Sequence, residues 1–297
     1  MATIDMVSGQ QTSASGGTFA LLASSVRRNR LASVGLVIIV SLSLLALLAP
    51  LISPFDPYDQ DLYAVLSGPT TQHWLGTDNL GRDLLSRLLY GARVSLMTRL
   101  LCTVFAAIIG IPIGLIAGYA GGMMDSILMR VTDAFLCFPP LIFILAMSAA
   151  LGPGLKNVIL SFTVFGWTGF ARIVRGQVLL VRELPYIEAA RATGVPKFRI
   201  MWRHVIPNTL APIIVAVSIT VGIAILVESG VSFLGLGVQP PTASWGKELR
   251  VGFTYLEVVP LFSLAPGLMI SLTVLGFNFF GDGLRDALDP RLRGFDR

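Results

Sequence analysis

The chain has 297 residues, of which 54% are hydrophobic and 13% are charged, and its mean hydropathy is +0.76. A soluble domain carries roughly 25% charged residues, so this composition excludes a single water-soluble core and indicates a membrane protein. The formal net charge of +5 suits contact with anionic lipid. The basic residues are scattered between apolar stretches rather than gathered on one face, which argues against nucleic-acid binding.

A helix that crosses a bilayer needs about 20 mostly apolar residues. Six stretches satisfy this requirement and predict an all-α membrane protein with six transmembrane helices: Leu31–Ile52, Leu100–Tyr119, Ala134–Leu151, Val158–Val181, Ala211–Gly237 and Val258–Phe280. The fourth is the least regular, because Arg172 and Arg175 interrupt it. We expect that helix to leave the membrane toward the basic side.

The basic residues between the spans predict the orientation, since cytoplasmic loops are enriched in Lys and Arg. With the N-terminus inside, 15 of the 22 Lys and Arg residues fall in cytoplasmic segments. Six spans then return the C-terminus to the same side. The prediction is a multi-pass protein of the cell inner membrane with both termini in the cytoplasm.

A regular spacing of small residues marks the second span. Gly110, Gly114 and Gly118 follow one another at intervals of four, so one face of that helix is smooth enough for close approach by a neighbouring helix. Pro139 and Pro140 in the third span are expected to bend it, because proline removes a backbone donor.

The segment between the first two spans predicts an external surface feature. From Asp78 to Tyr90 charged residues alternate with leucines, a pattern typical of a helix lying flat at the outer interface. Its polar residues are candidates for an external interface or gate: Asp78, Gly81, Arg82 and Asp83. Guarding the pore mouth, meeting a binding protein and simple anchoring at the interface all remain open.

Glu228 is the one carboxylate inside an otherwise apolar predicted span. A charged group there is unfavourable unless it faces the interior of the bundle. We favour a structural hydrogen bond to a loop or a partner helix over a role in a solute pathway.

The most informative segment is the basic stretch 182–207 between the fourth and fifth spans. Pro185 suits a first helical turn, Gly194 suits a left-handed cap, and Pro196 suits the start of a second short helix that Pro207 ends before span five. The prediction is a helix–glycine–helix elbow on the cytoplasmic face.

In this segment the chain resembles the EAA motif of permeases in type I ABC importers, through Glu188-Ala189-Ala190, Gly194, His204 and Pro207. The resemblance implies the fold of those permeases and identifies the elbow as a coupling helix held in a groove of a cytoplasmic ATPase. In that role the two alanines permit close approach, Glu188 offers a charge-assisted contact, and Gly194 allows the sharp exit.

Further segments resemble the second permease of dipeptide, oligopeptide and nickel importers: Trp74–Arg93, Glu228–Pro241 and Asn278–Arg291. The resemblance implies a division of the chain into two parts. Residues 1–92 would form an N-terminal arm, the first helix and an external segment, and residues 93–297 would form the permease domain. The partners it implies are a second permease, two ABC ATPases and an external solute-binding protein. Peptides are the preferred solute, with nickel or another small solute as alternatives.

The chain lacks a G-x-x-x-x-G-K-[ST] loop, so it has no phosphate cradle of its own. We expect it to be non-catalytic and to bind no cofactor, with ATP and Mg held by partner subunits. A stand-alone secondary transporter is the less favoured alternative, because such folds place ionisable groups and broken helices at the midplane in repeats. Glu228 is the only acidic residue inside a predicted span, and the sequence shows no convincing repeat.

Overall fold

The computed structural model describes residues 29–288, and its regular structure is helical, with one isolated β-bridge between Thr77 and Asp83. Within this part five helices are long and apolar enough to cross a membrane, and a bent pair of shorter helices makes a sixth candidate span. The predicted all-α architecture is therefore confirmed.

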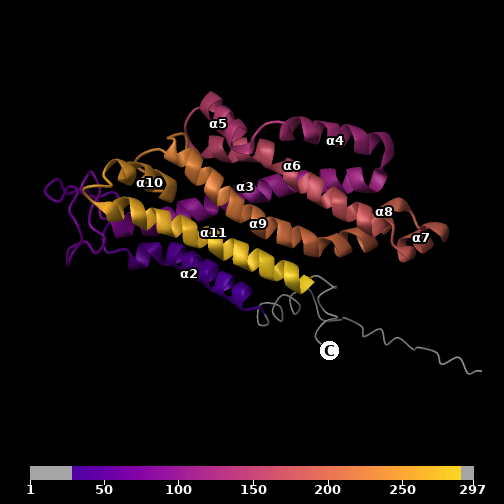
Figure 1. The fold of residues 1–297 in the computed structure, drawn as a ribbon, viewed down its shortest axis with the longest axis horizontal. Helices are drawn as coiled ribbons and strands as arrows, with labels where there is room; N and C mark the ends of the chain where they lie inside the picture. The colour runs from indigo at the N-terminus through magenta and orange to yellow at the C-terminus, as the bar shows by residue number, and fades with distance from the viewer. Residues whose placement is uncertain (1–28, 289–297) are drawn as a thin grey trace, which may run out of the picture.

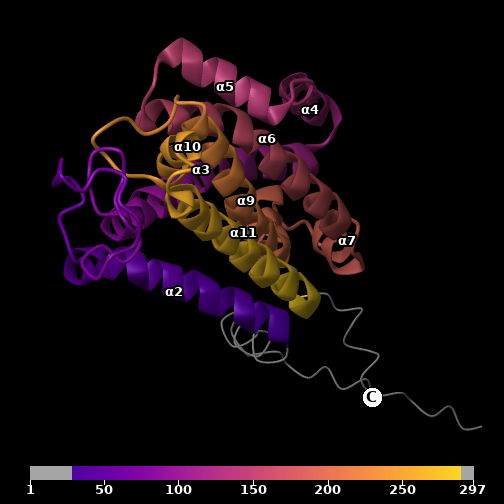
Figure 2. The same ribbon diagram turned by 60° about the vertical axis from the view of Figure 1, so that its left-hand side comes forward.

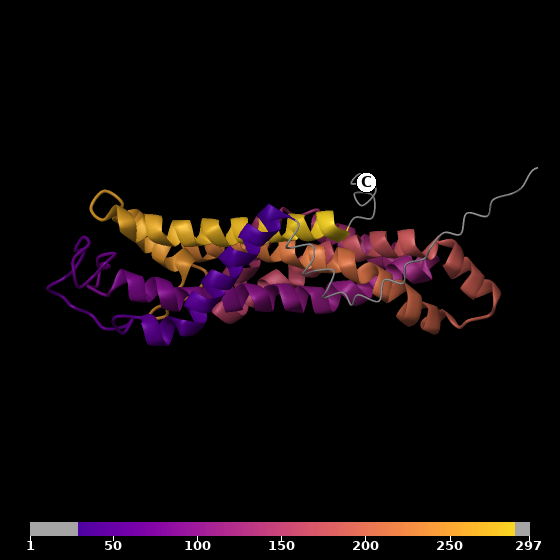
Figure 3. The same ribbon diagram turned by 90° about the horizontal axis from the view of Figure 1, so that it is seen from below.

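The long helices form an elongated bundle, in which α2 (Arg30–Ile52) crosses the others obliquely (Figures 1 and 3). The bounds of the others are α3 (Leu84–Ala120), α6 (Leu155–Arg182), α9 (Ile206–Phe233) and α11 (Pro260–Leu288). Helix α2 forms one edge of the bundle and the bent pair forms the opposite edge, as Figures 1 and 2 both show. The buried core lies between these edges, where α3 packs against α6 and α9 against α11.

The third predicted span, Ala134–Leu151, is not a single helix, and that prediction is wrong. The chain forms α4 (Gly122–Leu136) and α5 (Pro140–Leu151), which meet at an angle of 81°. Pro139 is extended, with φ −60° and ψ 128°, because the residue before a proline is excluded from the helical region. The two prolines therefore break the span instead of only bending it.

Aromatic rings hold the bent pair against α6. The ring of Phe135 lies edge-on to Trp167 at 5.6 Å between centroids, and Phe143 lies 5.2 Å from Phe165. Such pairs contribute about 0.5–1.5 kcal/mol each beyond the area they bury. Both α4 and α5 are thus fixed to the same helix on either side of the break.

The predicted flat helix over residues 78–90 is also wrong. From Leu84 onward this segment is the first part of α3, which continues without interruption for 37 residues, and Asp83 is its N-cap. Leu84, Leu88 and Leu89 are buried in the protein and do not face lipid. Leu88 packs with residues of α10 (Trp245–Thr254) and α11, and Leu84 packs with Phe262 of α11. The expected boundary between residues 92 and 93 lies inside this continuous helix.

The glycines of α3 confirm the predicted close approach of a neighbouring helix, which is α6. A Cβ atom on Gly114 would lie 2.5 Å from the Ala171 carbonyl oxygen and 2.8 Å from the Cβ of Val174. Gly110 and Gly118 meet the same helix one turn away on either side. Because only hydrogen fits at these positions, the two helices pack backbone to backbone along this face.

Candidate functional site

The elbow lies at one end of the bundle, opposite residues 53–83 and α10 (Figures 1 and 3). It consists of α7 (Pro185–Ala192), α8 (Lys197–Ile200) and the five-residue π-helical turn η1 (Met201–Val205). Pro185 occupies the first turn of α7, and Pro196 is the residue that precedes α8. A proline is favourable at a helix start because its missing N–H would have no helical partner there.

Gly194 ends α7 in the left-handed conformation, with φ +75°. The Gly194 N–H donates to the Arg191 carbonyl at 3.0 Å, and the Val195 N–H donates to the Ala190 carbonyl at 3.1 Å. These two bonds define a Schellman motif, in which a residue with positive φ reverses the chain at the helix end. The sharp turn between the two short helices depends on this glycine.

The residues of the EAA motif lie partly on the exposed side of α7 and partly on its buried side. Glu188 and Ala189 are exposed, whereas Ala190 is half-buried and Ile187 is fully buried. Within residues 29–288 Glu188 forms no ion pair. The side of α7 that carries Glu188 is therefore free to contact a partner.

A cluster of buried aliphatic side chains fastens the inner side of the elbow to the spans. Ile187, Ile200 and Val205 from the elbow pack with Val178 of α6 and Ile213 of α9. Three of these, Ile187, Ile200 and Val205, have no exposed surface. Because interiors are close-packed, this cluster fixes the elbow to both helices.

Pro207 does not end the second arm of the elbow, and that prediction is wrong. It lies in the first turn of α9, and the helical run from Lys197 to Phe233 is continuous. The chain accommodates the proline with the π-turn η1, where the Ile206 N–H donates to the Met201 carbonyl. His204 lies in this turn, and its ring is 6.2 Å from that of Tyr186, so it links the two arms.

Two exposed aromatic residues of the elbow were not predicted from the sequence as candidate contact residues. Phe198 is 69% exposed and Trp202 is 58% exposed, and their rings lie 5.9 Å apart. Phe198 and Trp202 are four residues apart and out of phase with the buried Ile200 and Val205, so the helical period of the sequence could have predicted an exposed aromatic pair. Aromatic side chains exposed beside a charged motif are typical of interface anchors.

At the other end of the bundle, the predicted external residues form an internal network. One Asp78 oxygen accepts from the backbone N–H groups of Leu80 and Arg82, at 2.8 and 2.9 Å, and the other accepts from Arg82 Nε at 2.6 Å. Asp78 is fully buried, Arg82 is 7% exposed and Asp83 is 2% exposed. These side chains shape the external segment from within and offer little surface to a partner.

Asp83 and Gly81 stabilise the backbone of the same segment. Asp83 accepts hydrogen bonds from the N–H and the hydroxyl of Ser86, both at 2.7 Å, and contacts His73 Nδ1 at 2.9 Å. Gly81 has φ +74°, and a Cβ there would collide with the backbone of Asp61. Both residues therefore fix the turn that leads into α3.

Arg87 is the centre of this network and was not singled out in the sequence. Its guanidinium donates to both carboxylate oxygens of Glu248, at 3.1 and 2.6 Å, and to the Pro57 carbonyl at 2.8 Å. Arg87 has no exposed surface. A bidentate pair of this kind joins α3, α10 and the external segment with defined geometry.

Lys247 lies beside this pair in α10. Burial, the largest cause, lowers the pKa of Lys247 from 10.5 to about 8, and the nearby carboxylate of Glu248 opposes that shift. The unfolded chain therefore binds more protons than the folded chain between these pH values. The contribution of Lys247 to stability is least favourable below pH 8 and improves as the pH rises through this range.

Glu228 has an ion-pair partner inside the bundle. Arg99 of α3 donates from Nη2 to Glu228 and, at 2.8 Å, to the hydroxyl of Ser229, while the Ser232 hydroxyl donates to Glu228 at 2.6 Å. The guanidinium carbon lies 5.7 Å from the ring centre of Trp245. The contacts of Glu228 are thus made within the chain, between α3 and α9.

No group of three His, Cys, Asp or Glu side chains that could hold a metal ion lies within residues 29–288. The polar groups that the fold brings together are instead the elbow and three buried ion pairs, Arg82–Asp78, Arg87–Glu248 and Arg99–Glu228. Five to six apolar spans, with a helical elbow at one end, define a multi-pass membrane protein.

Comparison with known proteins places this membrane protein in a family. The model of the binding-protein-dependent transport system inner membrane component matches residues 110–294, and the N-terminal TM domain of oligopeptide transport permease C matches residues 22–69. The chain belongs to this family of inner membrane transport components, and it is a permease subunit.

Its relatives carry the names of peptide permeases. The chain is 42% identical to the dipeptide transport system permease protein DppC of Alkalihalophilus pseudofirmus, over 90% of this chain and 88% of that protein. It is 41% identical to the oligopeptide transport system permease protein OppC of Bacillus subtilis, over 90% and 88%. The glutathione transport system permease protein GsiD of Pectobacterium atrosepticum is 42% identical, over 80% of each chain.

A solved structure shares the fold. A chain of the MetNI methionine ABC transporter in an inward-facing conformation aligns with a TM-score of 0.55 and 20% identity, over 69% of this chain and 97% of that chain. The predicted type I importer permease fold is confirmed by this likeness. The family implies ATPase and binding-protein partners.

Proposed function

We propose that this chain is one of two permease subunits of an importer for dipeptides or oligopeptides, driven by two separate ABC ATPases and supplied by an external solute-binding protein. The observation that carries the proposal is the identity of 41–42% over 90% of the chain to proteins named as dipeptide and oligopeptide permeases. In this arrangement ATP and Mg stay on the ATPases, both termini lie in the cytoplasm, and this chain binds no cofactor.

The elbow supports the proposed coupling. Glu188 is exposed and free to pair with a partner, and Phe198 and Trp202 offer exposed aromatic surface beside it. The buried side of the elbow is packed against α6 and α9. Movement of a docked ATPase would therefore displace two spans together, which is what alternating access requires.

A nickel importer is the second candidate, since the resemblance includes that substrate class. Nickel prefers imidazole and other nitrogen or oxygen donors, and the described spans bring no such set together. We therefore favour peptides. Uptake of a labelled dipeptide, compared with uptake of ⁶³Ni in cells that express the complete transporter, decides between the two.

The coupling role is tested by co-purification of the ATPase with Gly194→Asp. Any side chain at Gly194 strains the left-handed cap, but nothing lies within 4 Å of the added Cβ, so the spans are left intact. Gly152→Asp is the matched control, because Gly152 has φ +88°, equally open surroundings, and a position at the far end of α6.

We expect wild type and Gly152→Asp to retain the ATPase and Gly194→Asp to lose it, with all three proteins inserted at equal levels. Equal retention by Gly194→Asp and the control would refute the assignment of the elbow. If the wild type binds no ATPase, even with the complete transporter co-expressed, the importer proposal fails and a stand-alone transporter takes its place.

A further inference from the structure

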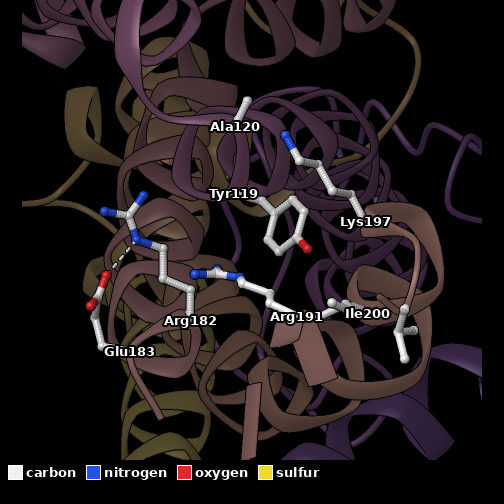
Figure 4. A pocket seen from close by; sticks show the side chains of 8 residues that line it. Tyr119, Ala120, Arg182, Glu183, Arg191, Lys197 and Ile200 are labelled. Atoms are coloured by element: carbon white, nitrogen blue, oxygen red, sulfur yellow. Dashed lines mark hydrogen bonds and ion pairs between the residues drawn. The ribbon is translucent and has the colours of Figure 1, made fainter. Parts of the chain in front are cut away.

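A pocket of about 510 Å³ lies where the elbow joins the spans. Its walls come from the ends of α3 and α6 and from the two short helices: Tyr119, Ala120, Arg182, Glu183, Arg191, Val195, Lys197 and Ile200. Figure 4 shows Tyr119 in the middle of these side chains, with the cationic groups around it. The coupling proposal assigns no task to this pocket.

The pocket carries an excess of positive charge. Three cationic side chains face one carboxylate, and that carboxylate, Glu183, already accepts from Arg182 at 2.9 Å. Arg182 also donates to the Gly118 carbonyl at 3.0 Å. Arg191 and Lys197 have no ion-pair partner in the described part of the chain. Two cations therefore remain available to an anion.

A buried hydroxyl group gives a second, independent indication of a ligand. The Tyr119 hydroxyl has no contact with solvent, and in residues 29–288 it has no hydrogen-bond partner. The guanidinium of Arg191 lies 5.9 Å from the centre of the same ring. Buried polar groups are normally paired, so a missing partner here points to a group that fills the pocket.

The surroundings of the pocket distinguish a lipid from a soluble anion. Apolar side chains lie about one helical turn from the pocket, toward the middle of the bundle. Ile116, which precedes the lining residue Ala120 in α3, is 46% exposed, and Leu180, which precedes Glu183 in α6, is 67% exposed. An anionic group in the pocket would therefore have apolar helix surface next to it, on the membrane side. Basic pockets between spans at the cytoplasmic face suit anionic headgroups.

We propose that this pocket binds the phosphate of an anionic phospholipid, whose acyl chains lie along α3 and α6. Arg191 and Lys197 supply the charge, and the Tyr119 hydroxyl donates a hydrogen bond to a phosphate oxygen. Because α7 and α8 contribute these cations, the lipid links the elbow to the surrounding membrane. The proposal does not depend on which solute the transporter carries.

The test measures binding of dioctanoyl phosphatidylglycerol to the purified full-length chain in a neutral detergent. The variant R191Q/K197Q removes the two free cations. The matched control R199Q/R203Q removes two exposed cations of the same elbow that do not line the pocket. Tyr119→Phe removes only the hydroxyl group.

We expect R191Q/K197Q to weaken binding about tenfold or more and Tyr119→Phe to weaken it by a smaller factor, with the control close to wild type. Dioctanoyl phosphatidylcholine should bind much more weakly. Equal loss in both double variants would show only diffuse attraction to a basic surface and would overturn the proposal, as would equal binding of the two lipids.

Two further experiments distinguish a lipid from a free anion and from the ATPase as the occupant of the pocket. If inorganic phosphate displaces the lipid at similar concentrations, the ligand is a free anion and the lipid assignment fails. If added ATPase displaces the lipid and R191Q/K197Q loses ATPase binding, the pocket belongs to the docking surface instead. Lipid binding that survives in the assembled transporter supports the proposal.

Discussion

The buried pair Arg99–Glu228 offers the sharpest test of how α3 and α9 are joined. Replacing Glu228 by leucine leaves the Arg99 guanidinium inside the bundle without its carboxylate. Breaking a buried ion pair from one side destabilises a protein by about 3–5 kcal/mol, because an uncompensated charge remains. We expect the same range here for Glu228→Leu.

The contacts around Arg99 place the expected loss toward the upper part of that range. Two guanidinium nitrogens, Nε and Nη1, have no hydrogen-bond partner within the described residues, and Nη2 makes the contacts to Glu228 and Ser229. Without Glu228 only the Ser229 hydroxyl remains. Glu228→Gln keeps an acceptor at this position and should lose less, about 1–3 kcal/mol.

The assay is unfolding by SDS in mixed micelles, followed by helicity and by tryptophan fluorescence, since Trp245 lies close to the pair. The double variant R99M/E228L removes both charges and should recover most of the stability that Glu228→Leu loses. The reasoning is refuted if Glu228→Leu costs less than about 1 kcal/mol, or if the double variant is no more stable than the single one.

Three other predictions concern the packing, the titration and the external ion pair. Gly114→Ala should destabilise the protein by about 1–3 kcal/mol in the same SDS titration, because its new methyl group meets the α6 backbone. Lys247 should be acylated with a half-maximal rate near pH 8, followed by mass spectrometry, because its pKa is lowered to about 8 by burial. Arg87→Met should expose the external segment 53–83 to protease, because Glu248 loses its bidentate partner.

Each of these predictions has an internal comparison. Gly169→Ala changes a glycine of α6 that has nothing within 4 Å of the added Cβ, and a loss equal to that of Gly114→Ala would contradict the packing argument. Lys156 and Lys197 are the only other lysines, and a shared pH profile for all three would contradict the lowered pKa. An external segment as protease-resistant in Arg87→Met as in wild type would show that the pair is dispensable.

Features that depend on local chemistry could be predicted from the sequence. The four-residue spacing of glycines anticipated the contact of α3 with α6, and Pro185 and Gly194 marked the start and end of α7. Each feature is decided by a side chain, or its absence, within one or two helical turns. The family resemblance was predicted on the same kind of local evidence.

Features that depend on distant partners could not be predicted. The charged segment 78–90 resembled a surface helix because its charges are conspicuous, yet Arg87 pairs with Glu248, 161 residues away. Nothing near Arg87 in the sequence identifies that partner. The error at Pro207 had a different cause, since a π-turn can absorb the missing N–H without ending the helix.

The arrangement of contacts along α3 explains why the subunit keeps buried charges that an apolar core could replace. Toward its N-terminal end α3 is tied by Arg87 to α10 and by Arg99 to α9, and toward its C-terminal end its glycines lie against the α6 backbone. Apolar contacts alone would tolerate a shift of one turn, whereas an ion pair is satisfied in only one register. We infer that the buried charges here select one arrangement of the helices, a role that buried charges have in some other proteins. Because α6 in turn carries the elbow, a fixed register of α3 is what would connect a movement at α7 to the opposite end of the bundle.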